Sequence, residues 1–205
     1  MSEIGAVILA AGLSSRMGQP KMALPWRDTT VIGQVARVLS QAGARPVVAV
    51  TGAEPALVGA AFMAALPDPD AGILALNPDY ANGEMLLSLQ AGVRALPETA
   101  EACLVALGDQ PQIEPEVVSL ILSSYRQDGG ILLVPSVHMR RGHPWLIHRA
   151  LWPDLLGLAS PSTPRDFLNR HAGEIRYMNV ERESILADLD TPEEYEKARR
   201  GKDGR

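Results

Sequence analysis

The feature that most constrains this chain is an apolar run at residues 4–10, IGAVILA, followed directly by a loop of small residues, AGLSSRMGQPK, at 11–21. Seven consecutive apolar residues are typical of a strand that is buried on both faces. The strand is therefore expected in the middle of a covered sheet, with the loop at its carboxyl end.

The loop itself has the composition of an anion site. Gly12 and Gly18 allow backbone N–H groups to turn towards a ligand, Ser14 and Ser15 add hydroxyls, and Arg16 and Lys21 add positive charge. A strand that ends in such a loop favours a polyphosphate ligand. The loop is not a Walker loop, because no Gly-Lys-Ser/Thr follows, and it lacks the G-x-G-x-x-G of dinucleotide sites.

The rest of the chain alternates apolar strands with helices. Strands are expected at 46–51, 73–76, 102–107, 131–135 and 175–180, and helices at about 30–41, 55–66, 85–96 and 115–126, with two more starting at Thr163-Pro164 and Thr191-Pro192. This alternation predicts an α/β fold, a three-layer α/β/α Rossmann-like domain with a mostly parallel sheet and a late antiparallel element. The 205 residues fit a single domain, 1–205.

Composition excludes several partners. The net charge of −5 argues against a nucleic-acid surface. Cys103 is the only cysteine, which rules out an internal disulfide and a cysteine metal cluster and fits a reducing cytoplasm. The first apolar run is too short to span a membrane and lacks the basic flank of a signal peptide. We therefore expect a cytoplasmic protein with no nucleic-acid or membrane partner.

A carboxylate is expected beside the loop. Ligands of doubly wound sheets bind beyond the carboxyl ends of the strands, and Asp109 lies just after the strand at 102–107. An exposed carboxylate at that edge suits Mg²⁺, which prefers oxygen ligands. The alternative is a turn residue that bonds the backbone ahead of Pro111.

Three segments together resemble one enzyme family. L-A-A-G-x-S-S-R-M-G-x-x-K at 9–21 resembles the signature loop of nucleotidyltransferases, and most closely that of the molybdenum cofactor cytidylyltransferase branch. G-D-Q-P at 108–111 and D-L-D-T-P-E at 188–193 resemble the branch's metal-binding segments. The resemblance implies that Asp109 and Asp190 hold Mg²⁺ and that Arg16 and Lys21 are catalytic, on the leaving phosphates. For Asp190 the alternative is a favourable charge at a helix N-terminus.

The resemblance also implies binding residues. Those for the nucleotide are Ala10, Ala11, Gly12, Ser14, Ser15, Asn77, Gly83 and Ser88. His143, in a Gly-His-Pro turn, would meet the acceptor. The nucleotide-binding half is then about 1–135 and the acceptor-side half about 136–200. Two departures are visible: the segment 84–87 is one residue longer than in relatives, and 160–164 replaces their Gly-Asp-x-Gly ahead of Arg165, so the acceptor pocket is expected to differ.

The implied reaction is a Mg²⁺-dependent transfer of CMP from CTP to a phosphorylated acceptor, with molybdopterin as the leading acceptor and pyrophosphate as the product. CTP is favoured because relatives that transfer GMP carry L-A-G-G, whereas Ala11 adds a methyl group here. Three alternatives stay open: another small phosphorylated acceptor, a non-catalytic nucleotide-binding domain, and a nicotinamide-dependent oxidoreductase, which the missing G-x-G-x-x-G disfavours.

Overall fold

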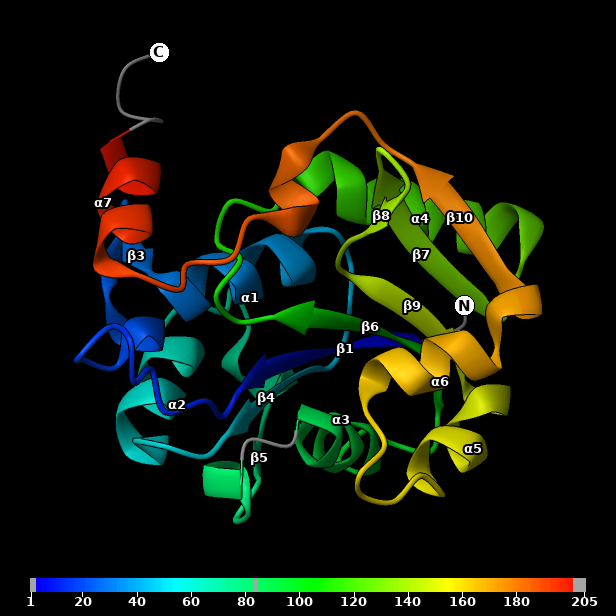
Figure 1. Cartoon of the computed structure of the whole chain (residues 1–205), viewed down its shortest axis with the longest axis horizontal. Coiled ribbons are helices and arrows are strands. Elements are labelled where there is room, and N and C mark those ends of the chain that lie inside the picture. Colours follow the sequence, from blue (N-terminus) through cyan, green and yellow to red (C-terminus); the bar gives the residue numbers. More distant parts are fainter. Residues whose placement is uncertain (1–2, 83–84, 201–205) are drawn as a thin grey trace.

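The computed structural model describes residues 3–82 and 85–200, and it is built around one twisted sheet (Figure 1). Its strands are β1 Glu3–Ala10, β4 Val47–Thr51, β5 Gly72–Leu76, β6 Ala100–Leu107, β7 Leu132–Val137, β8 Arg140–Arg141, β9 Trp145–His148 and β10 Ile175–Asn179; β2 Pro25–Trp26 and β3 Thr29–Thr30 form a separate hairpin. The helices are α1 Val31–Gln41, α2 Pro55–Met63, α3 Met85–Arg94, α4 Pro115–Asp128, α5 Trp152–Leu156, α6 Pro164–Arg170 and α7 Pro192–Arg200.

The strands of the large sheet follow the order β10-β7-β9-β6-β1-β4-β5, and β8 pairs with the end of β7. All pairs are parallel except those made by β9, which is antiparallel to β6 and β7, and by β8. This confirms the mostly parallel sheet and identifies its late antiparallel element. The carboxyl ends of β1, β4, β6, β7 and β10 therefore lie along one edge.

Helices cover both faces of the sheet. In β1, Ala6 and Ile8 point to a core that is shared with α1, α2 and α4, whereas Val7 and Leu9 point to a core that is shared with α3, α5 and α6. Because both faces are buried, the strand can be apolar at every position. The predicted three-layer α/β/α arrangement is confirmed.

Helix starts agree with the sequence better than helix ends. The Thr30 side chain caps α1 by accepting a hydrogen bond from Gly33 N, and Thr163 forms a capping box at α6. Helices α2 and α3 end three and two residues earlier than expected, ahead of Pro67 and Pro97. A proline disfavours helical backbone at the residue directly before it, so neither helix could continue up to the proline. Helix α5 was not predicted.

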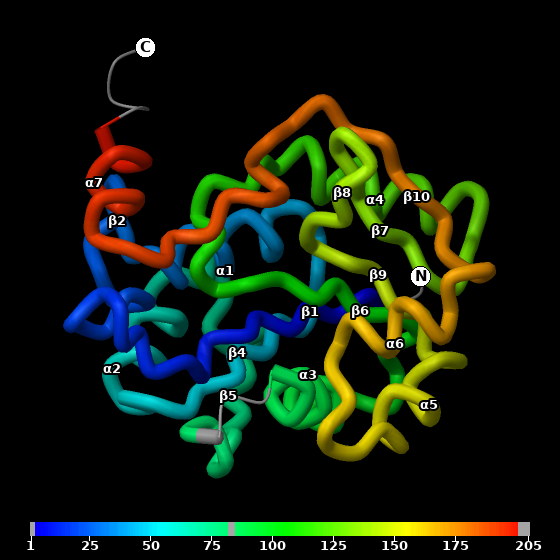
Figure 2. The backbone as a smooth tube through the Cα atoms, in the orientation of Figure 1, coloured from blue at the N-terminus to red at the C-terminus, as the bar shows by residue number. Residues whose placement is uncertain are grey.

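The last part of the chain returns to the carboxyl edge of the sheet. After β10 it passes over the ends of β7 and β6 and reaches α7 beside the β2–β3 hairpin (Figure 2). There Leu189 and Tyr195 pack on Met17, Trp26 and Val31, and the Tyr195 hydroxyl donates a hydrogen bond of 2.5 Å to the Pro25 carbonyl. This small third core fixes the segment 188–190 next to the loop after β1.

In the described part of the chain, no helix is long and apolar enough to cross a membrane. Cys103 is buried and not in a disulfide.

Candidate active site

The loop after β1 is held in shape by Ser14. This residue has a left-handed backbone (φ 52°), its carbonyl accepts a hydrogen bond from Met17 N at 2.9 Å, and its hydroxyl accepts one from Lys21 N at 3.2 Å. Gly18 is also left-handed (φ 65°). Beside Gly12 the space where a side chain would lie is open, as a loop that receives a ligand requires.

The Lys21 ammonium is the centre of a charged cluster. Lys21 is only 9% exposed, at the start of a 3-10 turn, and its Nζ donates hydrogen bonds to Asp109 Oδ2 (2.5 Å), to the Leu189 carbonyl (3.1 Å) and to Asp190 Oδ1 (3.3 Å). The more exposed Arg16 reaches the other oxygen of Asp190 at 3.0 Å. The two predicted catalytic cations and the two predicted metal ligands thus form one cluster.

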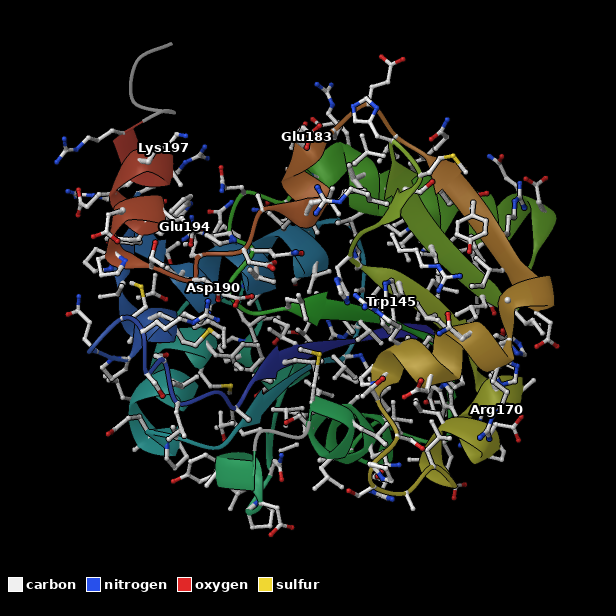
Figure 3. All side chains as sticks on the ribbon, in the orientation of Figure 1. Trp145, Arg170, Glu183, Asp190, Glu194 and Lys197 are labelled. Carbon is white, nitrogen blue, oxygen red and sulfur yellow. The ribbon has the colours of Figure 1, made fainter. Side chains whose placement is uncertain are left out.

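Asp190 owes its position to the C-terminal segment. The Leu189 N–H donates to the Asp109 carbonyl at 3.0 Å, which aligns the segment beside the end of β6. Figure 3 shows Asp190 just ahead of α7, close to Glu194. The Glu194 carboxylate accepts hydrogen bonds from the Asp190 and Thr191 N–H groups, and the Thr191 hydroxyl accepts one from Glu194 N. These contacts form a capping box at the predicted helix start.

A pocket of about 340 Å³ opens over this cluster at the ends of β1 and β6. It is lined by Leu9, Ala11, Gly12, Arg16, Lys21, Met22, Tyr80, Met85, Ser88, Leu107, Asp109, Asp188 and Asp190. A second pocket of about 310 Å³ continues over the ends of β1 and β4 and includes Ser14 and Ser15. Gly12, Met22 and Tyr80 line both, so the two pockets form one elongated site.

Asp188 is a third carboxylate of the site, which the sequence analysis did not assign. Burial raises its pKa, the neighbouring charges of Asp109 and Asp190 raise it further, and a hydrogen bond from Gln110 Nε2 (2.7 Å) works in the opposite direction. The Asp-Leu-Asp spacing was the available signal, because residues two apart in an extended segment share a face.

The donor set fits a magnesium ion that is shared with a phosphate ligand. Among residues 3–82 and 85–200, no three His, Cys, Asp or Glu side chains are grouped closely enough to hold a metal. Mg²⁺ needs no such cage, since it is usually bound by one or two carboxylates together with phosphate oxygens and water. Asp109 and Asp190 already converge on one cation, the Lys21 ammonium.

The remaining predicted nucleotide residues have different surroundings. Ala11 and Ser88 line the pocket, whereas Ala10 lies in the core. Asn77 is 2% exposed, and its side chain accepts from Asp79 N and donates to Ser88 Oγ at 2.9 Å. Asn77 is thus placed to orient Ser88. Gly83 lies outside the described residues.

His143 lies beside the site without lining it. The His143 ring stacks on the Trp145 ring with 4.5 Å between the ring centroids. The backbone N–H of His143 donates a hydrogen bond to the Ile185 carbonyl at 3.0 Å. Burial lowers the pKa of the imidazole to about 4, so the ring is neutral at neutral pH. It could reach an acceptor as a neutral hydrogen-bonding group, not as a cation, and its role stays a prediction.

Known proteins resemble this chain over most of its length. The model of the MobA-like NTP transferase domain matches residues 6–175. The molybdenum cofactor cytidylyltransferase of Escherichia coli K12 is 32% identical over 195 residues, with 95% of each chain covered. The nicotine blue oxidoreductase of Paenarthrobacter nicotinovorans is also 32% identical, over 200 residues that cover 93% of this chain and 94% of that protein.

Among solved structures, Rv0371c of Mycobacterium tuberculosis H37Rv in complex with manganese superposes with a TM-score of 0.75 and 26% identity, covering 97% of this chain and 98% of that one. A nucleotidyltransferase fold, a strand-end loop with its cation and carboxylate cluster, and a family match over most of the sequence lead to one conclusion: this chain belongs to the MobA-like NTP transferase family.

Proposed function

We propose that the protein is a Mg²⁺-dependent cytidylyltransferase, which transfers CMP from CTP to a small phosphorylated acceptor, with molybdopterin as the leading candidate, and releases pyrophosphate. The observation that carries the proposal is the convergence of Arg16, Lys21, Asp109 and Asp190 on one pocket at the ends of β1 and β6. The relative named as a molybdenum cofactor cytidylyltransferase supports this acceptor.

The chain's own groups suit nucleotidyl transfer. An acceptor phosphate is already an anion, so the reaction needs alignment and charge neutralisation more than a general base. Arg16 and Lys21 would bind the β- and γ-phosphates and stabilise the charge that develops on the leaving pyrophosphate, while N–H groups of residues 11–15 hold it in place. Asp109 and Asp190 would hold Mg²⁺, which supplies further neutralisation of the phosphates when bound.

The charges of the cluster are paired within the protein itself. The Lys21 ammonium neutralises the same carboxylates that would hold the metal. Asp109 and Asp190 would hold Mg²⁺ in place of the ammonium, and Lys21 would then be available to the phosphates of the triphosphate.

An oxidoreductase activity is the second candidate function, because the nicotine blue oxidoreductase has the same sequence identity to this chain, 32%, as the cytidylyltransferase. The residues favour transfer. A redox reaction has no need for two cations next to two carboxylates at the mouth of a phosphate loop, and the loop at 11–21 lacks the dinucleotide pattern.

Ala11 supports CTP over GTP. Ala11 lines the pocket of about 340 Å³ that contains Lys21, Asp109 and Asp190, which we call the nucleotide pocket. Its methyl group takes up space that a glycine would leave free. One methyl group too many in a close-packed site costs about 1–3 kcal/mol, or roughly 5- to 150-fold in affinity. The smaller pyrimidine is therefore expected to bind more tightly than the purine.

The test is pyrophosphate release in the presence of molybdopterin, with CTP, GTP or ATP, and with Mg²⁺ or EDTA. We expect release with CTP and Mg²⁺, and little with GTP. Nucleotide binding without pyrophosphate release, whichever acceptor is added, would indicate a non-catalytic domain. Oxidation of a reduced nicotinamide or flavin by an added electron acceptor, catalysed by the same preparation without molybdopterin, would favour the redox candidate. Equal or tighter binding of GTP would refute only the argument from Ala11.

A further inference from the structure

A third pocket, of about 840 Å³, lies further along the same edge of the sheet and carries an unusual charge. It is lined by Ser136, Met139, Arg140, Arg141, Arg165, Tyr177 and Leu186, which come from β7, β8, the start of α6, β10 and the segment before Asp188. Three arginines and no acidic residue line it, although the whole chain has a net charge of −5. We call it the arginine pocket.

Arg141 is held in place from within the protein. Its Nε and one terminal nitrogen donate to the Tyr177 hydroxyl at 3.0 and 2.7 Å, and its other terminal nitrogen donates to Asn169 Oδ1 at 3.0 Å. Neither partner is a carboxylate, so among the described residues the guanidinium is oriented without an acidic partner. An arginine fixed in this way is prepared for an anion.

Arg140 and Arg165 have no such partners. Within residues 3–82 and 85–200, neither side chain makes a hydrogen bond, and neither lies within 4.0 Å of a carboxylate. Ser136 is 7% exposed, lines the pocket and makes no side-chain hydrogen bond within that same part of the chain. Glu183, an acid on the neighbouring turn, is paired with His138 instead. The pocket thus offers buried and exposed donors that lack an acceptor.

The arginine pocket adjoins the nucleotide pocket but is separate from it. Leu186 lines the first and Asp188 lines the second, and two residues of chain span at most about 7 Å. The two pockets share no lining residue. The strands follow the order β4, β1, β6, β9, β7 and β10 across the sheet (Figure 1). Asp109 follows β6, whereas Ser136 and Tyr177 of the arginine pocket belong to β7 and β10. The linings of the two pockets thus approach each other at the segment 186–188.

We propose that the arginine pocket binds an anionic oxygen-rich group of the acceptor, distinct from the phosphate that attacks the nucleotide. The inference rests on the proposed function and narrows its substrate class to acceptors with two separated anionic groups. An attacking phosphate must lie beside the α-phosphorus, in the pocket of Asp109 and Asp190. A group bound by Arg140, Arg141 and Arg165 is therefore a second anion, and it would orient the first.

The probe is inorganic phosphate, titrated calorimetrically against protein whose nucleotide site is filled with Mg²⁺ and a CTP analogue that carries a methylene bridge between its α- and β-phosphates. We expect one saturable phosphate site in the wild type. Each of Arg140→Gln and Arg165→Gln should weaken it about tenfold, because hydrogen bonds to charged groups are the strong ones. Arg176→Gln is the matched control: it lies on β10 next to Tyr177, but its partner is Asp128 and it does not line the pocket.

The outcomes separate the two proposals. An absence of saturable phosphate binding in the wild type, or equal binding in the double variant Arg140→Gln/Arg165→Gln, overturns the arginine pocket while nucleotide binding stands. If no triphosphate binds, phosphate is titrated without nucleotide. A phosphate site that depends on Arg140 and Arg165 then supports the pocket, although the proposed function fails. Binding of the CTP analogue should be unchanged in all four variants, because none of these arginines lines the nucleotide pocket.

Discussion

Replacing Lys21 by alanine removes the ammonium that Asp109, Asp190 and the Leu189 carbonyl share. Removing one partner of a buried ion pair lowers the free energy of unfolding by about 3–5 kcal/mol. The cost is smaller here, because the Asp190 side chain is 35% exposed and keeps its contact with Arg16. We expect a loss of about 1–3 kcal/mol, which lowers the melting temperature of a chain of this size by roughly 3–10 °C.

The response to Mg²⁺ distinguishes this prediction from a general loss of stability. In the variant, Asp109 and Asp190 are left without their shared cation, so Mg²⁺ alone should bind there and restore part of the lost stability. In the wild type the ammonium competes for the same carboxylates. Mg²⁺ should therefore raise the melting temperature of Lys21→Ala more than that of the wild type. Pyrophosphate release should still fall by about 10²–10³, since the metal does not replace a contact to the leaving group.

The assay is thermal unfolding with and without Mg²⁺, followed by pyrophosphate release at saturating CTP. Lys197→Ala is the matched control, because Lys197 is exposed on α7 and points away from the site (Figure 3). The reasoning would be refuted by a variant as stable as the wild type in EDTA, or by one that Mg²⁺ stabilises no more than the wild type. Near-normal pyrophosphate release would refute the catalytic role of Lys21 separately.

Three further predictions concern the metal, a half-buried histidine and a close contact in the core. Asp109→Asn should remove most of the Mg²⁺ dependence of CTP binding, and more of it than Asp190→Asn; calorimetry in Mg²⁺ and in EDTA measures this, and an unchanged Mg²⁺ effect would leave Asp109 as a turn residue. His143 has a folded pKa of about 4 against an ordinary 6.5, so the unfolded chain binds more protons between these values and stability falls as the pH drops through this window. His143→Asn should reduce that loss by about 1–2 kcal/mol in urea unfolding at pH 7 and pH 4.5, and parallel pH profiles for variant and wild type would count against it. Gly92→Ala should destabilise the fold by about 1–3 kcal/mol, because the added carbon would lie 2.2 Å from the Val7 side chain; an unchanged urea midpoint would show that α3 can shift away from the sheet.

The sequence could predict those parts of the site that depend on local patterns. The apolar strand, its glycine and serine loop, and Asp109 after a second strand are each visible within a few residues, and parallel strands bring such strand ends to one edge. Asp190 was within reach through the resemblance. None of this indicated that Lys21 pairs with carboxylates 88 and 169 residues away in the chain.

Other features could not be predicted because they depend on contacts between residues that are far apart in the sequence. Strand β9 has only four residues, and its place between β6 and β7 depends on partners on both sides and not on its own pattern. The arginine pocket combines residues from 136 to 186 that share no spacing. In the same way, the raised pKa of Asp188 arises from burial and from charges that the fold brings together.

The packing of residues 188–190 beside the loop after β1 has a consequence for translation. The sheet from β1 to β10 uses no residue beyond Asn179, whereas Asp188 and Asp190 come from the segment that Leu189 and Tyr195 anchor on Trp26. A ribosome that stops before residue 188 would release a chain with its strands and phosphate loop but with only part of its acidic cluster. Lys21 would then have Asp109 but neither Asp190 nor the Leu189 carbonyl to contact. The acidic cluster is thus completed only when the last part of the chain has been translated.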